Sequence, residues 1–352
     1  MPFLTKYQTI ILVLVASIIT SCKSANSQKN LTQNLCIGFY NLENLFDTYR
    51  DSTIMDEEFT PAGSKNWTQE KYNNKLKNLA KVISELGKSK NSSGPAILGI
   101  CEIENRQVLR DLLNTDLLKN TPYQIVHYDS RDSRGIDVAL FYKPSIFKLL
   151  ESKSYNVLLR DSIEGNKYTR DVLLVKGQIE NQVFYFTVNH WPSRRSGTSA
   201  SQKYRNQLAS INKSLYDSIS IKEPNPVFIV MGDLNDNPSD ESVKYILKAH
   251  KDKEYVKSQE FFNPFYQTYK NGEGSLAHNG SWNLFDQIIL SHKLLHPEKG
   301  EWEYYDHQVF HRDYMLETDG KYKNYPKRSF SGDNWNNGYS DHFPTLVFLR
   351  KK

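Results

Sequence analysis

The amino-acid sequence predicts an α/β fold in one domain over residues 35–352. Short apolar runs of strand length recur from Leu35 onward. Stretches with the three-and-four spacing of an amphipathic helix separate some of these runs. No low-complexity segment follows Gln33 and no internal repeat is present, so the sequence does not indicate a second domain.

Eight apolar runs are predicted as strands, because they combine a length of five to eight residues with many branched and aromatic side chains. In chain order they cover residues 35–40, 96–101, 137–142, 172–179, 183–188, 227–231, 284–290 and 345–349.

Helices and loops are predicted between these strands. Apolar side chains recur every three or four residues over 72–86 and 204–215, which predicts two amphipathic helices. A shorter helix is expected with Ser239 as its N-cap. Residues 262–283 and 296–342 show no such repeat. Because they are rich in aromatic residues, we predict that they form long ordered loops.

The N-terminal segment resembles a bacterial lipoprotein signal. The apolar run from Thr9 to Thr20 has twelve residues, fewer than the ~20 that a membrane-spanning helix needs. It ends in IITSC, which resembles the lipobox where lipoproteins are cleaved and lipidated on the cysteine, here Cys22. We therefore predict a signal peptide over residues 1–21 and a lipidated polar tether over residues 22–34. The protein would be exported and anchored in a membrane, in the periplasm or at the cell surface. Plain secretion and an uncleaved anchor are the alternatives.

The other two cysteines, Cys36 and Cys101, are predicted to be free buried thiols. On neighbouring parallel strands they would lie at different depths, offset by on the order of 13 Å. A disulfide needs Cα atoms within ~7 Å, so pairing is not expected even in an oxidising compartment.

The charge composition does not predict a dedicated nucleic-acid-binding protein. A net charge of +5 arises from 45 basic and 40 acidic residues, which is a mild excess. It is compatible with an anionic substrate and does not require one.

Several predicted strands end in a narrow set of polar residues. Ligands of α/β sheets bind at strand ends, so we expect these side chains to gather at one place. A polar residue that merely caps a strand is the alternative for any single one. The residues are Asn41 and Glu43, Glu102 and Glu104, Asn189 and His190, and Asp233 and Asn235.

The types of these residues point to a hard divalent cation. Asp233 and Asn235 are two apart in an extended chain and therefore share a face. Carboxylate and amide oxygens suit Mg²⁺ or Mn²⁺, and no Cys/His spacing typical of zinc sites is present. His190 and His342 add imidazoles that can be cationic near neutral pH and so stabilise developing negative charge.

Six motifs occur in an order that is similar to a known superfamily. NLEN, CEIEN, NHWPSR, GDLND, FDQIIL and SDHFP are spread over residues 35–349. In this order and spacing they resemble the endonuclease/exonuclease/phosphatase superfamily with its deoxyribonuclease I-like fold. The resemblance implies a four-layer α/β sandwich, in which two packed mixed β-sheets are flanked by helices.

The resemblance also implies roles for individual residues. Metal binding falls on Asn41 and Glu102, with Asp341 near the metal. Glu104 is expected to be structural. The predicted catalytic residues are His190 for the scissile phosphate, Asp233 and Asn235 for the attacking water, and Asp286, which orients His342. Asp236 and Asp240 are expected to be ordinary residues of a turn and a helix start.

Basic and aromatic residues near these motifs are candidate substrate contacts. We predict that Arg170, Arg194 and Arg195 bind substrate phosphate. Lys203 and Arg205 belong to the same basic segment, for which a solvated helix face is the alternative. The tryptophans beside the motifs are expected to pack in loops more often than to stack on bases; they are Trp191, Trp282 and Trp335.

These observations lead to one principal hypothesis and two alternatives. The principal hypothesis is a lipid-anchored, Mg²⁺- or Mn²⁺-dependent phosphodiesterase, and specifically an endonuclease on extracellular or periplasmic nucleic acid. Abasic-site repair members of the superfamily have asparagine where His190 stands, so the histidine favours the deoxyribonuclease, sphingomyelinase and phosphatase branches. The first alternative is a phosphatase or a sphingomyelinase-like phospholipase, and the second is a non-catalytic surface binding protein. No protein partner is predicted, and a monomer is expected.

Overall fold

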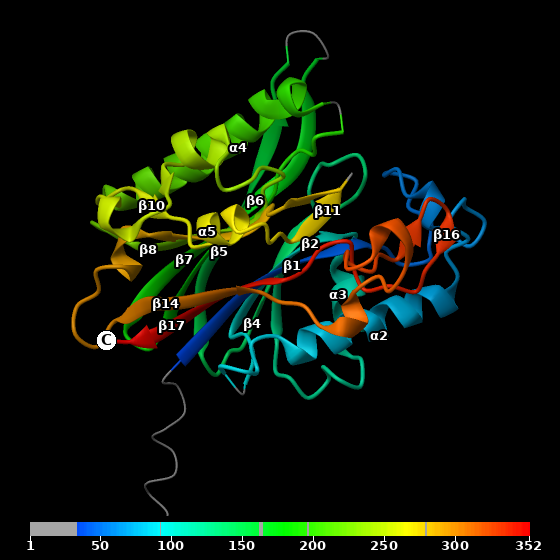
Figure 1. Cartoon of the computed structure of the whole chain (residues 1–352), viewed down its shortest axis with the longest axis horizontal. Coiled ribbons are helices and arrows are strands. Elements are labelled where there is room, and N and C mark those ends of the chain that lie inside the picture. The colour runs from blue at the N-terminus through cyan, green and yellow to red at the C-terminus, as the bar shows by residue number, and fades with distance from the viewer. Residues whose placement is uncertain (1–33, 92, 162–164, 196, 279) are drawn as a thin grey trace, which may run out of the picture. The chain divides into compact units, whose positions relative to one another are not determined.

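Two mixed β-sheets form the centre of the computed structural model (Figure 1). The structure describes residues 34–91, 93–161, 165–195, 197–278 and 280–352. The predicted signal peptide, the lipidation site Cys22 and the tether up to residue 33 lie outside the described residues. Asn34, predicted as the last tether residue, already belongs to the first strand.

The first sheet has six strands in the order β14-β17-β1-β2-β4-β3. Its strands are β1 (Asn34–Leu45), β2 (Ile97–Ile103), β3 (Gln124–His127), β4 (Asp137–Tyr142), β14 (Trp302–Val309) and β17 (Thr345–Lys351). β1 and β2 are parallel, so they end at the same edge of the sheet. β17 runs antiparallel to β1 and therefore begins at that edge.

The second sheet has seven strands in the order β5-β6-β7-β8-β13-β10-β9. Its strands are β5 (Phe147–Leu159), β6 (Lys167–Ile179), β7 (Gln182–His190), β8 (Val227–Asp233), β9 (Ala249–His250), β10 (Phe261–Phe262) and β13 (Asp286–Ser291). β7 and β8 are parallel, whereas β13 is antiparallel to β8. The first residue of β13, Asp286, is the register partner of Asp233, the last residue of β8.

Helices and short elements connect and cover the sheets. The α-helices are α2 (Gln69–Glu85), α3 (Arg106–Leu113), α4 (Thr198–Ser220) and α5 (Phe265–Lys270). Two small hairpins pair β11 (Leu276–His278) with β12 (Ser281–Asn283), and β15 (Phe330–Ser331) with β16 (Asn334–Trp335). The single-turn helices are η1 (Glu57–Phe59), η2 (Ser242–Ile246), η3 (Lys253–Tyr255), η4 (His292–Leu294), η5 (Asp313–Met315) and η6 (Gly320–Tyr322).

The alternation of side chains along β8 shows how the layers pack. Ile229 and Met231 belong to the apolar cluster that fills the space between the sheets. Phe228 and Val230 point the other way and join the cluster beneath α4, which lies along the outer face of this sheet (Figure 1). Since both faces are covered, the strand is apolar at every position up to Gly232. The predicted four-layer α/β sandwich is confirmed.

Every strand predicted from the sequence is present, but several elements were not predicted. β5 and β14 carry many half-exposed polar residues, and β14 lies inside the stretch 296–342 that was wrongly predicted as a loop. The short helix after Pro238 begins at Ser242, and Glu241 rather than Ser239 is its N-cap residue. This correction follows from the Asn237–Pro238 turn, which delays the start of the helix.

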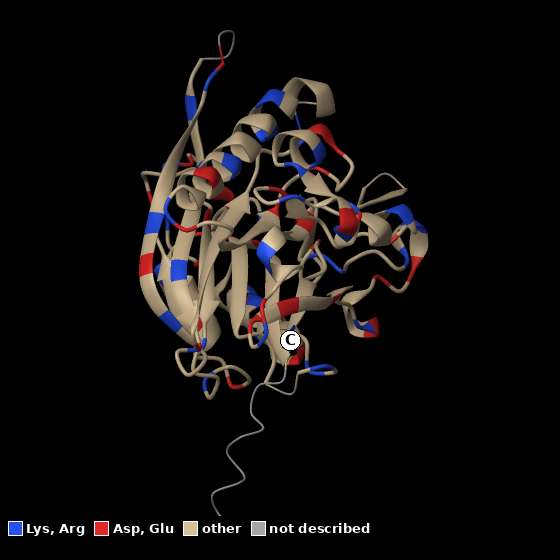
Figure 2. Ribbon diagram, turned by 90° about the vertical axis from the view of Figure 1, so that its left-hand side faces the viewer, with Lys and Arg blue, Asp and Glu red and all other residues tan. Residues whose placement is uncertain are grey.

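The thiols and the charges behave as the sequence predicts. Cys36 and Cys101 are free and buried, and Cys101 lies opposite Asn41, five residues beyond Cys36. In the view of Figure 2, basic and acidic positions are interspersed over the ribbon, in keeping with the net charge of +5. Among the described residues, no helix is long and apolar enough to cross a membrane.

Two glycines allow close contacts beneath the strand ends. A methyl group at Gly99 of β2 would lie 2.4 Å from Met231 Sδ of β8, so this glycine lets the two sheets approach each other. A methyl group at Gly232 would lie 2.4 Å from the carbonyl oxygen of Asn189 in the neighbouring strand β7. A larger residue at Gly99 would displace the side chain of Met231, and one at Gly232 would displace the backbone of β7.

Gly232→Ala is expected to destabilise the protein by about 1–3 kcal/mol, because the added methyl group must displace backbone of β7. Urea unfolding followed by circular dichroism measures this change. Ser214→Ala on the exposed side of α4 is the control and should change stability by less than about 0.5 kcal/mol. Equal stability of the Gly232→Ala variant and the wild type would contradict the close contact.

Candidate active site

The ends of four central strands, two from each sheet, meet at one place. Asn41 of β1 and Glu102 of β2 come from the first sheet, while His190 of β7 and Asp233 of β8 come from the second. The amide nitrogen of Asn41 lies 3.2 Å from Glu102 Oε1 and 3.1 Å from Asp233 Oδ2. One amide thus joins the carboxylates of the two sheets.

Bulges in the first sheet aim these side chains. The pairing of β2 with β4 shifts register between Cys101 and Ile103, so Glu102 is the extra residue there. The pairing of β1 with β2 shifts register between Asn41 and Leu45, so the extra residues of that pair lie in β1. Glu102 has φ of 59°, a left-handed conformation that is uncommon for a non-glycine residue. Such conformations persist where the surrounding structure enforces them, as they do at many functional sites.

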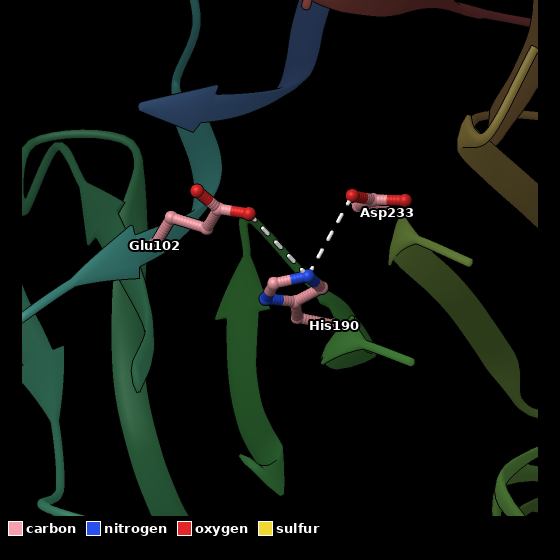
Figure 3. Close-up of side chains that lie close together, drawn as sticks. All are labelled: Glu102, His190 and Asp233. Atoms are coloured by element: carbon pink, nitrogen blue, oxygen red, sulfur yellow. Dashed lines mark ion pairs between the residues drawn. The ribbon is translucent and has the colours of Figure 1, made fainter. Parts of the chain in front are cut away.

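Three side chains have the spacing of ligands around one cation (Figure 3). Glu102 Oε1, His190 Nε2 and Asp233 Oδ2 all lie within 4.8 Å of one another. His190 Nε2 is 3.6 Å from the Glu102 oxygen and 3.7 Å from the Asp233 oxygen, too long for hydrogen bonds. Two carboxylates and an imidazole are a suitable donor set for a divalent transition metal or Mg²⁺, so these residues fit a metal site.

This cluster differs from the predicted metal set of Asn41, Glu102 and Asp341. The amide oxygen of Asn41 accepts a hydrogen bond from the backbone N–H of Glu43 at 2.9 Å, and its nitrogen faces the carboxylates. Asn41 therefore orients the ligands. Asp341 Oδ2 accepts from Arg328 at 2.6 Å, while its Oδ1 lies 3.9 Å from His342 Nε2. Asp341 thus lies at the edge of the cluster, paired with an arginine.

The predicted pair of Asp286 and His342 is present. Asp286 begins β13 and His342 precedes β17, so both lie at the edge where β1 and β8 end. His342 Nδ1 is 2.6 Å from Asp286 Oδ2, and its Nε2 is 3.9 Å from Asp233 Oδ2. Burial alone would lower the pKa of His342, but three carboxylates outweigh it and raise this pKa well above its ordinary value. They are those of Asp286, Asp233 and Asp341.

The second histidine has the opposite electrostatic environment. Burial lowers the pKa of His190 well below its ordinary value, and three neighbouring positive charges add to this effect. These charges belong to Arg170, Arg134 and His342. His190 is therefore a neutral imidazole at neutral pH, contrary to the expectation that it is cationic. A neutral imidazole is the form that binds a metal.

Asp233 and Asn235 form the predicted pair. The backbone N–H of Asn235 donates to Asp233 Oδ1 at 3.0 Å, and the Asn235 side chain donates to the carbonyl of Trp191 at 2.9 Å. Burial raises the pKa of Asp233 to about 7; the charge of His342 opposes this shift, and the carboxylates of Asp286 and Glu102 add to it. Asp233 Oδ2 faces both histidines.

One member of each of the other pairs is structural, namely Glu43, Glu104 and Asn189. Glu43 accepts hydrogen bonds from Lys75 at 3.3 Å and from the backbone N–H of Ser329 at 2.7 Å. Glu104 accepts from the backbone N–H of Asp47 at 2.7 Å, in agreement with the structural role expected for it. The side chain of Asn189 is fully buried. It forms hydrogen bonds with β8 of the second sheet and with α4.

Two of the three predicted phosphate-binding arginines are engaged inside the protein. Arg170 is buried, lies 3.2 Å from Asp132 and donates to the carbonyl of Trp191 at 2.9 Å. Through its hydrogen bond to Trp191, it fixes the start of the loop that follows His190. Arg194 donates to the carbonyl of Asn235 at 2.7 Å and stacks on the ring of Phe285.

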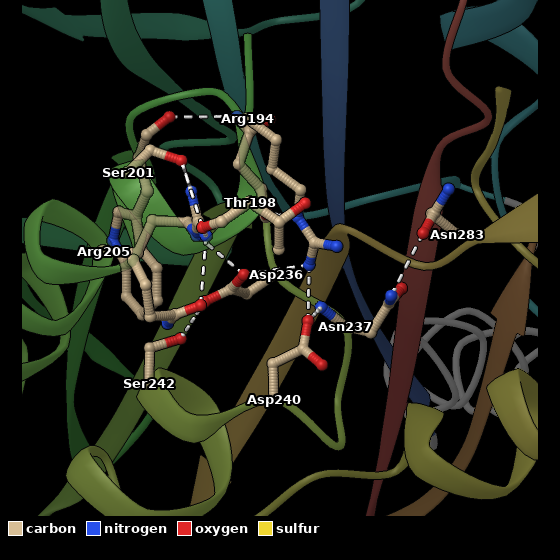
Figure 4. Close-up of polar contacts among 12 residues, drawn as sticks. Arg194, Thr198, Ser201, Arg205, Asp236, Asn237, Asp240, Ser242 and Asn283 are labelled. Atoms are coloured by element: carbon tan, nitrogen blue, oxygen red, sulfur yellow. Dashed lines mark hydrogen bonds and ion pairs between the residues drawn. The ribbon is translucent and has the colours of Figure 1, made fainter. Parts of the chain in front are cut away.

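One of the two carboxylates that hold Arg194 also binds helix α4 (Figure 4). Asp236 accepts from Arg194 at 2.9 Å and from Arg205 of α4 at 2.6 Å, and Asp240 pairs with Arg194 as well. Asp236 is fully buried, so the expectation that it is an ordinary turn residue was wrong. This network fixes the loop that carries Asn235 to α4. The geometry assigns Arg194 to this structural task, which no local sequence pattern reveals.

One arginine near the centre was not predicted. Arg134, in the loop before β4, is exposed, donates to Asn44 Oδ1 at 3.2 Å and is close enough to lower the pKa of His190. Arg195, the third predicted arginine, is also exposed. Both line one cavity of about 300 Å³. The only sequence signal for Arg134 is the polar run SRDSRG before a predicted strand.

The tryptophans beside the motifs pack against other aromatic rings or against buried polar groups. Trp191 is fully buried, with its indole nitrogen 3.2 Å from Asn189 Oδ1. Trp282 stacks on Phe343, and Trp335 packs edge-on against Trp67. Packing, the alternative that was favoured for these residues, therefore describes them better than base stacking does.

The sequence matches the Endonuclease/Exonuclease/phosphatase family over residues 36–351. The chain belongs to this family. Its members are metal-dependent phosphoric ester hydrolases. The Endonuclease/Exonuclease/phosphatase match covers both sheets and every residue of the candidate site. A comparison with curated proteins gave no match.

Several solved structures share the fold at low sequence identity. D. rerio TDP2 complexed with single strand DNA product is 14% identical, with a TM-score of 0.53, covering 90% of this chain and 99% of that one. The human Nocturnin catalytic domain with bound sulfate anion is 12% identical, with a TM-score of 0.53, covering 91% of this chain and 95% of that one. Bacteroides thetaiotaomicron mannosyl-6-phosphatase is 16% identical, with a TM-score of 0.50, covering 90% of this chain and 99% of that one.

Asp286→Asn is expected to lower the pKa of His342, because it removes the nearest negative charge and keeps an oxygen that can accept from Nδ1. Titration of the imidazole by NMR in protein treated with EDTA measures this pKa. Asp116→Asn, which removes an exposed carboxylate, is the control and should leave the titration unchanged. An unaltered His342 pKa in Asp286→Asn would show that Asp286 does not hold the imidazole.

Proposed function

We propose that this chain is an exported, lipid-anchored phosphodiesterase that depends on Mg²⁺ or Mn²⁺ and acts as an endonuclease on extracellular or periplasmic nucleic acid. One observation supports the hydrolytic site above all others. Glu102, His190 and Asp233 converge from two sheets beside a histidine that is held by its own carboxylate. The match to a family of metal-dependent phosphoric ester hydrolases agrees with this arrangement.

The three converging side chains would hold the divalent cation. When bound, the cation supplies a Lewis acid that polarises a phosphoryl oxygen. Asn41 keeps Glu102 and Asp233 in place through its two hydrogen bonds. Burial of the cluster excludes competing water from these groups and strengthens their electrostatic effect.

His342 and Asp233 would carry the protons. Asp286 accepts the hydrogen on Nδ1, so the other nitrogen, Nε2, faces Asp233. Because its pKa is raised, His342 carries a proton on Nε2 at neutral pH and donates it to the phosphoryl or leaving oxygen. Asp233 would orient the attacking water and take its proton.

Support for nucleic acid as the substrate comes from the surroundings of this centre. Arg134 and Arg195 line a cavity next to it. TDP2, which shares the fold, has been solved with a single strand DNA product. A phosphatase acting on a small ester is the second candidate, since a mannosyl-6-phosphatase also shares the fold. A non-catalytic binding protein is disfavoured because all seven residues predicted to carry the chemistry are in place, namely Asn41, Glu102, His190, Asp233, Asn235, Asp286 and His342.

Asp233→Asn and His342→Ala should each reduce plasmid nicking by at least about 100-fold, because each removes an acid–base group or ligand of the centre. Nicking with Mg²⁺ or Mn²⁺, and its loss in EDTA, is measured by gel electrophoresis. RNA, sphingomyelin and a generic phosphomonoester are assayed in parallel to separate the candidate activities.

The control for these variants is His296→Ala, which removes an exposed histidine away from the centre. This variant should retain wild-type activity. Hydrolysis of the phosphomonoester alone would replace the nuclease by the phosphatase. Absence of hydrolysis of all four substrates with either cation would refute an enzymatic function.

The lipid anchor is tested separately through Cys22. Cys22→Ser should abolish incorporation of labelled fatty acid when the full chain is expressed in bacteria, because the thiol that accepts the lipid is lost. Cys101→Ser, which changes one of the two buried cysteines, is the matched control and should keep the label. Undiminished labelling of the Cys22→Ser variant would rule out lipidation at this residue.

A further inference from the structure

A basic cavity adjoins the candidate centre. It has a volume of about 300 Å³, and five of its lining side chains are basic: Lys65, Lys75, Arg134, Arg195 and Arg328. Asn44 also lines it, as do three carboxylates, those of Glu43, Glu58 and Asp341. The backbone N–H of Asn44 donates to Glu102 Oε2 at 3.0 Å, so the cavity begins where the proposed metal ligands end.

Two of these five positive charges are not compensated. Lys65 lies 3.0 Å from Asp333, Lys75 lies 3.3 Å from Glu43, and Arg328 lies 2.6 Å from Asp341. In the part of the chain that the structure describes, neither Arg134 nor Arg195 has a carboxylate within ion-pair distance. Arg134 donates only to the neutral amide oxygen of Asn44. Two exposed guanidinium groups at one cavity form a suitable site for a phosphate, which accepts paired hydrogen bonds from arginine.

This cavity is not where the reacting phosphate would lie. The reacting phosphate must reach Glu102, His190 and Asp233, and none of the three lines the cavity. Lys65, Trp67 and Phe330 also line the cavity and come from segments that contribute no residue to the centre. A group bound in the cavity is therefore a second part of the same substrate.

A second cavity adjoins the basic cavity. It has a volume of about 350 Å³, shares Arg328 and Asp341 with the basic cavity, and is lined by Tyr322 and Tyr325. Tyrosine rings provide flat surfaces on which a base can stack. A basic cavity followed by an aromatic one matches the alternation of phosphates and bases along a nucleic-acid strand.

We propose that the basic cavity binds the phosphate adjacent to the scissile one in a nucleic-acid strand, with Arg134 and Arg195 as its ligands. This inference rests on the proposed phosphodiesterase function and deepens it. The substrate must carry at least two phosphates separated by one nucleoside. A diester with a single phosphate occupies the centre and leaves the two arginines without a partner.

Dinucleotides with and without a terminal phosphate test the subsite. The probes are dTpdT, its 5′-phosphorylated form and its 3′-phosphorylated form, assayed with the full chain and Mg²⁺. One of the two terminal phosphates should raise kcat/KM by about tenfold or more, as expected for charge-assisted hydrogen bonds. Arg134→Ala and Arg195→Ala should each bring the ratio of kcat/KM with the terminal phosphate to kcat/KM without it towards one. Arg134→Lys should restore part of this ratio.

The control variant is Arg110→Ala, which removes an exposed arginine of α3 and should keep the wild-type ratio. Arg134→Ala and Arg195→Ala could instead lower kcat/KM equally for all three dinucleotides. In that case the arginines would act on the scissile phosphate, and the second subsite would be refuted. A ratio near one in the wild type would refute it as well.

A binding measurement separates this inference from the proposed function. Thymidine 3′,5′-bisphosphate and thymidine 5′-monophosphate are titrated calorimetrically into the full chain with Mg²⁺. Tighter binding of the bisphosphate that is lost in Arg134→Ala supports the subsite even if no ester is hydrolysed, in which case only the proposed function fails. Hydrolysis of diesters without any preference for the bisphosphate leaves the proposed function standing and refutes the subsite.

Discussion

The candidate site depends on the close packing of the two sheets, to which the contact between Met231 and Gly99 contributes. Met231 lies two residues before Asp233, and Gly99 lies three residues before Glu102. Because each strand is stiff and buried, the spacing of the sheets at this contact sets the spacing of the two carboxylates above it. The amide of Asn41 then links these carboxylates directly. The geometry of the site is therefore a property of the apolar core.

Local sequence patterns predict the strands and helices that are buried, and they fail where burial is partial. β8 is apolar up to Gly232 and is predicted from the sequence, whereas the six middle residues of β14 are all only partly buried and mostly polar, and β14 is not predicted. The strand ends were recognised as a site because carboxylate, amide and imidazole recur there. Their distribution over two sheets depends on long-range packing, which the family resemblance supplied and no local pattern contains.

The same limit applies to individual charges. Arg194 and Arg195 are neighbours in the sequence, yet Asp236 and Asp240 hold the first while the second is exposed. His190 and His342 are both buried, but burial dominates for His190, with arginine charges adding to it, whereas three carboxylates outweigh burial for His342, so the pKa values of the two imidazoles shift in opposite directions. Residue type predicts which groups can ionise. The neighbours, which come from distant parts of the chain, decide whether they do.

The basic cavity and the catalytic cluster are built from different parts of the fold. Strand ends provide the ligands and the acid–base groups, whereas most residues that line the cavity lie in connections between strands, such as the loop of Arg134 and the β15–β16 hairpin. Loops can change in length and sequence without disturbing the packed strands beneath them. In this architecture, substrate preference can therefore diverge during evolution while the machinery for breaking a phosphate ester is inherited unchanged.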